Sequence, residues 1–225
     1  MPSTRRVAYA IAASAILASC TAGHNGTHDS APTNTSSPPP HRASRDSSGA
    51  LVTIAELRDV SGLPTDLEAQ TIPTSGNIPI PRGTCGANLT QPNLDKGRAI
   101  GFSSPTGTEG YELTAALSAL QAKTYMNQVI GNLRAGCPGY TIHTTAGYTE
   151  TLVLKAIVNL HTNVGQAIAY IADTTLLGQT THTAEVDLLQ QNTYAYLVLT
   201  SAAPITALTV QSLAITAANQ LAKSR

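Results

Sequence analysis

Apolar and polar residues alternate along several short segments of this chain, which is the two-residue period of β-strands. Val, Ile, Thr and Tyr, which favour strands, are common in these segments. Short polar turns separate the last four segments, a spacing that is typical of an antiparallel meander. The predicted strands cover residues 98–103, 111–119, 151–161, 166–174, 180–189 and 193–200.

Other segments repeat their apolar residues with the 3.6-residue period of helices. Thr53 and Glu56 have capping-box spacing at the start of the first, and Gly136 and Pro138 end the second. The predicted helices cover residues 54–60, 122–133 and 205–223. This order of elements predicts an α+β fold, in which one antiparallel sheet of about five to six strands has its helices packed mainly on one face.

The beginning of the chain has the layout of a secretory signal peptide. Arg5 and Arg6 precede an uncharged, mostly apolar stretch at 7–17, which is shorter than the roughly 20 apolar residues of a membrane span. The sequence LASC, ending at Cys20, resembles a lipobox, whose cysteine receives a diacylglycerol and becomes the new N-terminus. We therefore expect residues 1–19 to be removed. Acyl chains on Cys20 would then hold the protein on the extracytoplasmic face of the cell membrane.

Residues 20–49 are predicted to be a disordered, Thr/Ser/Pro-rich tether. They contain no Leu, Ile, Val or aromatic residue, so they cannot bury enough apolar surface to offset the entropy lost on ordering. Residues 50–225 are long enough for one domain with a substantial core. With Cys20 lipidated, Cys85 and Cys137 remain as an even pair in an exported domain. They are predicted to form one disulfide, and two free buried thiols are the alternative.

The charge balance and the motifs exclude several functions. The chain has 13 Lys and Arg against 13 Asp and Glu, with no basic run, so nucleic acid is not an expected partner. The sequence has no G-x-S-x-G, no H-E-x-x-H, and no Walker or dinucleotide glycine motif. His143, His161 and His182 lie on separate segments. We therefore expect no enzyme, no metal site and no cofactor.

Two groups of polar residues have more than one interpretation, so no ligand-binding residue is assigned from the sequence. Glu185 and Asp187 share one face of a predicted strand, either as paired carboxylates or as part of a solvated face. The neighbouring Thr181 and Thr183 favour the solvated face. The second group either lines a cleft for a sugar or lipid head group, or simply packs on the sheet. Its members are Tyr170, Tyr194 and Tyr196.

Two segments of the domain carry a resemblance to a known family. They are NLRAGCPGY at 132–140, where a helix ends, and LLQQNTYAYLVLT at 188–200, before a closing Ala-rich helix. With the lipobox and tether, they resemble mycobacterial and other actinobacterial lipoproteins that have a PknH-like extracytoplasmic sensor domain, here over roughly residues 50–223. The family's receptor kinase has a kinase domain and two sensor disulfides. This chain has no kinase domain and one candidate disulfide.

The resemblance implies a non-enzymatic domain that binds a small molecule or a cell-envelope component in a cleft outside the membrane. A lipid or glycolipid carrier with an enclosed apolar cavity is the alternative. The two functions differ in the site that they require, since a carrier needs a large, dry, apolar pocket.

Replacing Cys20 by Ala removes the thiol that would carry the acyl chains. We expect the Cys20→Ala protein to be released into the medium or to remain unprocessed in the membrane, whereas the wild type should enter the detergent phase of Triton X-114. Unchanged partitioning of the mature variant would contradict the lipoprotein prediction.

Overall fold

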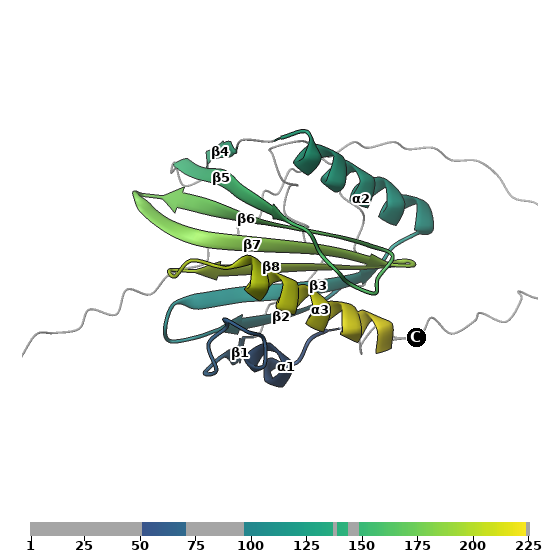
Figure 1. Ribbon diagram of the computed structural model, residues 1–225, viewed down its shortest axis with the longest axis horizontal. Coiled ribbons are helices and arrows are strands. Elements are labelled where there is room, and N and C mark those ends of the chain that lie inside the picture. The colour runs from purple at the N-terminus through teal and green to yellow at the C-terminus, as the bar shows by residue number, and fades with distance from the viewer. Residues whose placement is uncertain (1–50, 71–96, 137–138, 144–148, 224–225) are drawn as a thin grey trace, which may run out of the picture. The chain divides into compact units, whose positions relative to one another are not determined.

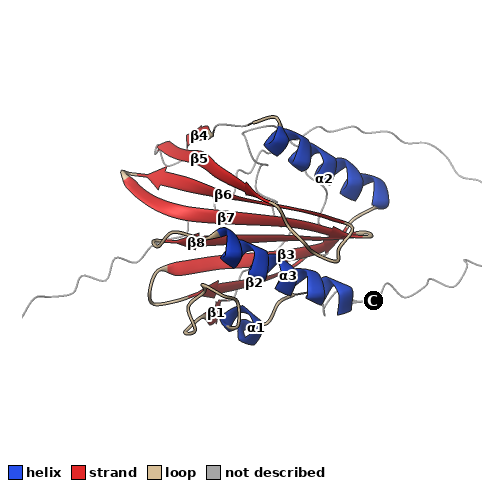
Figure 2. Cartoon of the chain, in the orientation of Figure 1, coloured by secondary structure: helices blue, strands red, loops and turns tan. Residues whose placement is uncertain are grey.

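The computed structural model describes residues 51–70, 97–136, 139–143 and 149–223 (Figures 1 and 2). The chain divides into two compact units, residues 1–45 and 46–225, and every described residue belongs to the second. The elements are α1 (Ile54–Arg58), β1 (Glu68–Gln70), β2 (Arg98–Ser103), β3 (Thr108–Ala116), α2 (Ala119–Arg134), β4 (Tyr140–His143), β5 (Thr149–Val158), β6 (Gln166–Leu176), β7 (Gln179–Gln190), β8 (Thr193–Ser201) and α3 (Ala207–Lys223).

The strands of the described residues form one eight-stranded antiparallel sheet in the order β1-β2-β3-β8-β7-β6-β5-β4. The first three strands form a meander from one edge. α2 then carries the chain to the other edge at β4, and a second meander returns to β3, so that β8 pairs with it (Figure 1). This arrangement confirms the predicted α+β fold with a single antiparallel sheet.

The sheet has more strands than the five to six that were expected. Every strand predicted from alternation is present within a few residues of its expected bounds. The two additional strands are β1, with three residues, and β4, with four, and both lie at the edges of the sheet. Segments this short have too few positions to show a period of two, so their sequence does not distinguish them from loop.

Two capping boxes fix where the first two helices begin. In α1, the Thr53 hydroxyl accepts from the Glu56 backbone N–H at 3.2 Å, and the Glu56 carboxylate accepts from the Thr53 N–H at 2.9 Å. This confirms the capping box predicted from the sequence. Ser118 and Gln121 form the same motif before α2. Apolar spacing alone did not reveal the second box, so the predicted helix began three residues late.

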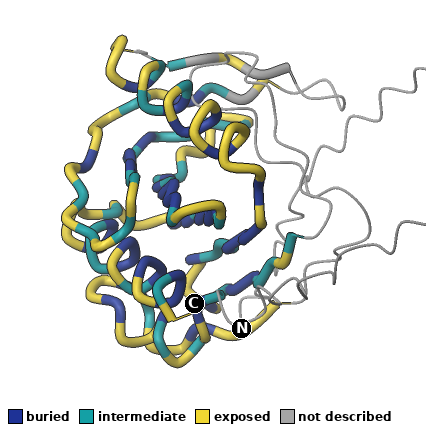
Figure 3. Tube along the Cα trace, turned by 90° about the vertical axis from the view of Figure 1, so that its right-hand side faces the viewer, coloured by how far each residue is buried: buried dark blue, intermediate teal, exposed yellow. Residues whose placement is uncertain are grey.

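The two faces of the sheet are covered by different helices. On one face, Leu57 of α1 and Leu213 of α3 pack in a cluster with Val186 of β7. On the other face, Met126 of α2 packs in a cluster with Tyr170 of β6. Two of the three described helices therefore share a face, as expected, and α2 covers the opposite one. Figure 3 shows that buried and exposed residues are interspersed along these elements.

None of the helices in the described part of the chain is long and apolar enough to span a membrane.

Gly110 of β3 lies close to both of its neighbouring strands. A Cβ at this position would meet the Val198 carbonyl oxygen and the Phe102 ring. We expect Gly110→Ala to lower the free energy of unfolding by about 1–3 kcal/mol, the usual cost of overpacking. Urea unfolding measures this difference.

Gly131 in α2 provides the matched control, because a Cβ added there has nothing within 4 Å. Gly131→Ala should be neutral or should stabilise the domain by up to about 1 kcal/mol, since Ala favours helix over Gly. A Gly110→Ala protein as stable as the wild type would contradict the close packing of β2, β3 and β8 around this position.

Candidate functional site

The strand register brings together the two groups of polar residues that the sequence left open. Tyr170 of β6 lies directly opposite Glu185 of β7, and Asp187 of β7 lies directly opposite Tyr196 of β8. Directly opposed residues of antiparallel strands point to the same face of a sheet. Both carboxylates therefore share a face with these tyrosines, on the side of the sheet that α2 covers.

Two further tyrosines join this group from other elements. The ring of Tyr111 in β3 lies 6.0 Å from that of Tyr196, tilted by 53°. The ring of Tyr125 in α2 meets Tyr194 edge-on, with centroids 5.3 Å apart, which is a favourable aromatic geometry. We refer to the whole group as the tyrosine–carboxylate cluster. Its members are Tyr111, Tyr125, Tyr170, Glu185, Asp187, Tyr194 and Tyr196.

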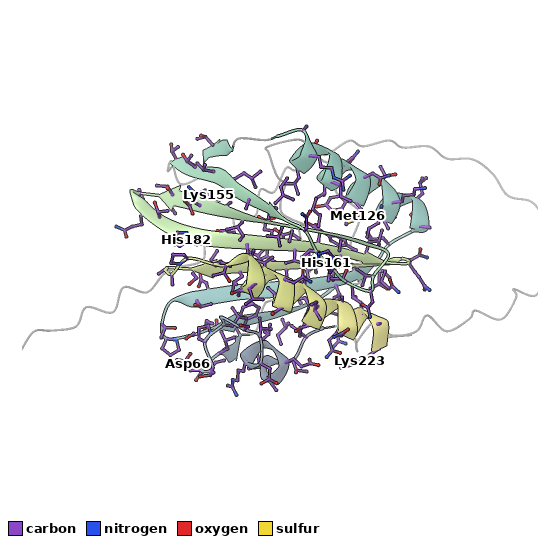
Figure 4. The ribbon with its side chains drawn as sticks, viewed as in Figure 1. Asp66, Met126, Lys155, His161, His182 and Lys223 are labelled. Carbon is purple, nitrogen blue, oxygen red and sulfur yellow. The ribbon has the colours of Figure 1, made fainter. Side chains whose placement is uncertain are left out.

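Sequence reasoning placed Tyr111 and Tyr125 at apolar positions of a strand and a helix, and did not single them out among the tyrosines of the domain as candidates to line a cleft. Their rings do pack in the core, so the periodicity placed them correctly. The sequence did not predict that their hydroxyl groups lie near two acids, because this proximity depends on the pairing of β3 with β8 and on the position of α2. Met126, the neighbour of Tyr125, is fully buried on the same side of α2 (Figure 4).

The expectation that Glu185 and Asp187 lie on a solvated face is wrong for Asp187 and only partly right for Glu185. Asp187 is 2% exposed and Glu185 is half-buried. The cause is α2, which packs over this face through Tyr125 and its contact with Tyr194. The threonines beside the acids in the sequence gave no information about a helix that comes from another part of the chain.

Burial dominates the electrostatics of both acids. It raises the pKa of Asp187 to about 7, the hydrogen bond from the Tyr194 hydroxyl at 2.5 Å opposes the rise, and the Glu185 charge adds to it. Burial also raises the pKa of Glu185, against the effect of the Tyr170 and Tyr196 hydroxyls. In the described part of the chain, no basic side chain contributes to either shift. Near neutral pH the cluster thus holds protons that exposed acids would have lost.

Four tyrosines of the cluster, Tyr111, Tyr125, Tyr194 and Tyr196, stay protonated over the same range. Burial raises the pKa values of Tyr111 and Tyr125 further above neutral, and the charges of the two acids add to the effect. The hydroxyls therefore remain available as hydrogen-bond donors next to the carboxyl groups. Such a cluster is chemically suited to bind groups that donate hydrogen bonds or carry positive charge.

Glu112, on the opposite face of the sheet, is a second buried acid that the sequence did not reveal. It is 0% exposed, and its Oε2 accepts from the Val52 backbone N–H at 2.6 Å. Burial raises its pKa to about 8, while the Val52 hydrogen bond opposes the rise and the Glu56 charge adds to it. The alternation around Glu112 suggested an exposed strand position. α1 and the segment before it cover that position instead.

The three histidines of the domain lie on different elements. His182 of β7 contacts Asp173 at 2.8 Å, and Lys155 contacts the other Asp173 oxygen at 3.1 Å, on the face opposite the cluster (Figure 4). His161 exchanges backbone hydrogen bonds with the Gln211 side chain. His143 belongs to the edge strand β4. Among the described residues, no three His, Cys, Asp or Glu side chains are placed to hold a metal.

The predicted lipidation and disulfide residues, Cys20, Cys85 and Cys137, lie outside the described residues. Some of the described residues line a surface depression of about 430 Å³ between α1 and α3. The residues that line it are polar, and the carboxylate of Glu56 among them already contacts Lys223 at 3.4 Å.

Comparison with solved structures identifies the fold. The chain is similar to the crystal structure of the extracellular domain of PknH from Mycobacterium tuberculosis, with a TM-score of 0.54 and 15% sequence identity. The match covers 79% of this chain and 93% of that chain. This confirms, at the level of the fold, the resemblance to a PknH-like sensor domain. No protein-family model and no curated protein matches the sequence.

The raised pKa values predict that the domain is more stable at mildly acidic than at alkaline pH. Asp and Glu titrate near pH 4 in an unfolded chain. Above about pH 4, the folded state therefore keeps protons that the unfolded state has lost, on Asp187 up to about pH 7 and on Glu112 up to about pH 8, and the raised pKa of Glu185 acts in the same direction. Stability falls as pH rises through this range. By urea unfolding, the domain should be at least about 1 kcal/mol more stable at pH 5 than at pH 8.5, since one pKa unit is worth about 1.4 kcal/mol.

Glu112→Gln tests whether Glu112 is responsible for the loss of stability as pH rises. The amide keeps an acceptor for the Val52 N–H and cannot ionise, so the variant should lose less stability between pH 5 and pH 8.5 than the wild type. Glu56 and Asp173, whose pKa values are lowered, affect stability only at more acidic pH. If the free energy of unfolding of the wild type rises from pH 5 to pH 8.5, the raised pKa values of the buried acids are disproved.

Proposed function

We propose that this protein is a lipid-anchored extracytoplasmic lipoprotein whose domain works as a sensor-like binding module. The domain would bind a small molecule or a cell-envelope component at the tyrosine–carboxylate cluster. The observation that carries the proposal is this cluster, in which two acids and four tyrosines share one sheet face and Tyr125 of α2 packs against them, in a fold similar to an extracellular domain.

The energetic cost of the cluster supports a functional role. Burying carboxyl groups without a basic partner is unfavourable, and a core of apolar residues would be more stable. Titratable groups with shifted pKa values that gather in one place are typical of binding and catalytic sites. Glu185 and Tyr111 are half-buried, whereas Asp187 and Tyr194 are fully buried. The first two residues would meet the ligand, and the second two would hold them in place.

The lipid anchor and tether set where binding would occur. A flexible chain of about 30 residues has a root-mean-square length of roughly 30 Å. Residues 20–49 would therefore keep the domain within a few nanometres of the membrane surface while leaving it free to turn. The membrane is then a partner through the acyl chains on Cys20, and the ligand is a component of the surrounding envelope.

We propose a binding role and not catalysis. His182, the histidine with a carboxylate partner, lies on the face opposite the cluster and shares Asp173 with Lys155. General acid–base catalysis needs such a group within reach of the bound substrate. A reproducible hydrolase activity that His182→Ala abolishes would contradict this part of the proposal.

The alternative of a lipid or glycolipid carrier has less support. A carrier needs a large apolar cavity. The depression that the described residues line between α1 and α3 is bordered by polar side chains, and the tyrosine–carboxylate cluster brings acids and hydroxyl groups to the face that α2 covers.

Native mass spectrometry of the full chain, purified from membranes in mild detergent, tests the proposed function. We expect a small molecule to co-purify with the wild type and to be lost from Tyr111→Ala, which removes a half-buried ring at the rim of the cluster. His182→Ala, on the opposite face, should retain it. The absence of any bound molecule from the wild type, or its loss only from His182→Ala, would contradict the assigned site.

A further inference from the structure

We infer that the ligand of the tyrosine–carboxylate cluster carries an organic ammonium group, which Glu185 receives beside the rings of Tyr111 and Tyr196. This inference rests on the proposed function, because it names the ligand chemistry of the same site. It follows from the position of the rings, the absence of a basic partner for the acids in the described residues, and a buried hydroxyl group directed at them.

The register places the cluster in two rows across the sheet. The first row is Tyr111, Val198, Glu185 and Tyr170, and the second is Leu113, Tyr196, Asp187 and Ile168. Glu185 thus has a tyrosine directly opposite on β6 and another two strands away on β3. The faces of aromatic rings attract cations, and a carboxylate beside them adds a full opposite charge. This combination of groups favours a positively charged ligand over a neutral one.

The charges of the described residues support the same conclusion. Two basic side chains have partners elsewhere: Lys155 pairs with Asp173 on the opposite face, and Lys223 pairs with Glu56 of α1. Arg58 donates to the Leu67 carbonyl oxygen. In the part of the chain that the structure describes, no lysine or arginine contributes to the pKa of Glu185 or Asp187. A bound cation would supply the positive charge that the described residues of this face do not provide.

The Tyr196 hydroxyl provides an independent observation. Tyr196 is 2% exposed, and its hydroxyl has no hydrogen-bond partner at ordinary distance among the described residues. It nevertheless lies near enough to Glu185 and to the Tyr111 hydroxyl to oppose the rise in the pKa of both groups. A buried hydroxyl without a partner is unfavourable. A bound cation would stabilise the ionised form of Glu185. The Tyr196 hydroxyl would then donate its hydrogen bond to that carboxylate, which explains its orientation.

Protonation of the two acids would compete with such a ligand. Among the described residues, the titratable groups that face Glu185 and Asp187 are Tyr111 from β3, Tyr125 from α2, Tyr170 from β6, and Tyr194 and Tyr196 from β8. Burial raises the pKa values of Tyr111, Tyr125, Tyr194 and Tyr196, so the two acids are the groups of this set whose ionisation changes near neutral pH. Binding of a cation should therefore strengthen as pH rises from 6 to 8, whereas binding of a neutral ligand should not.

Choline and its neutral isostere 3,3-dimethyl-1-butanol test the inference, since they share a shape and differ in charge. In calorimetric titrations of the full chain at pH 8, choline should bind saturably and at least tenfold more tightly than the isostere. Its affinity should fall at least threefold at pH 6. Glu185→Gln should weaken choline binding at least tenfold.

Asp173→Asn, which removes a carboxylate from the opposite face, should leave choline binding unchanged. Tyr111→Ala is the second variant, and it should weaken choline binding even if Glu185→Gln does not fold. Equal affinity for the two probes, or no saturable choline binding at millimolar concentration, would overturn the inference about charge. The proposed function would still stand if mass spectrometry finds a bound neutral molecule that Tyr111→Ala loses. It would fail if no bound molecule is found.

Discussion

The pairing of β3 with β8 holds the two halves of the sheet together. Thr108 lies opposite Ser201 and Ala116 opposite Thr193, so the two strands are paired along their whole length. Without this pairing, the strands before α2 and the meander after it would be separate sheets with exposed edges. The same pairing places Tyr111 next to Tyr196 and aligns Glu112 with Leu197. Both the candidate site and the buried acid on the opposite face therefore depend on one contact between distant segments.

Much of this arrangement could be predicted from the sequence. The alternation in β5 to β8 and the turn residues between them were sufficient to predict these strands, although consecutive buried residues in β6, β7 and β8 show that both of their faces are covered over much of their length. The capping box at Thr53 is a local pattern, and so the sequence was sufficient to locate the start of α1. The strands β1 and β4 were not predicted, because segments this short form strands mainly through their pairing with β2 and β5.

The site could be predicted only in pieces. Glu185 and Asp187 were recognised as sharing a face, and Tyr170, Tyr194 and Tyr196 as candidates to line a cleft. Their assembly depends on the register of neighbouring strands, and the burial of Asp187 depends on α2. Neither is a property of the local sequence. Glu112 shows the same limit, because an acid at an alternating strand position is normally exposed, and only the covering by α1 makes it buried.

The position of β8 at the centre of the sheet has a consequence for when the chain can fold. β8 and α3 are the last elements to be synthesised, yet β3 and β7 both need β8 as a neighbour. A fold that depends on contacts so distant in sequence forms slowly. A chain that lacks β8 and α3 therefore has no continuous sheet, because β3 and β7 each lack their shared neighbour. The two meanders can form separately, but the sheet closes only when the segment that contains β8 becomes available to both of them.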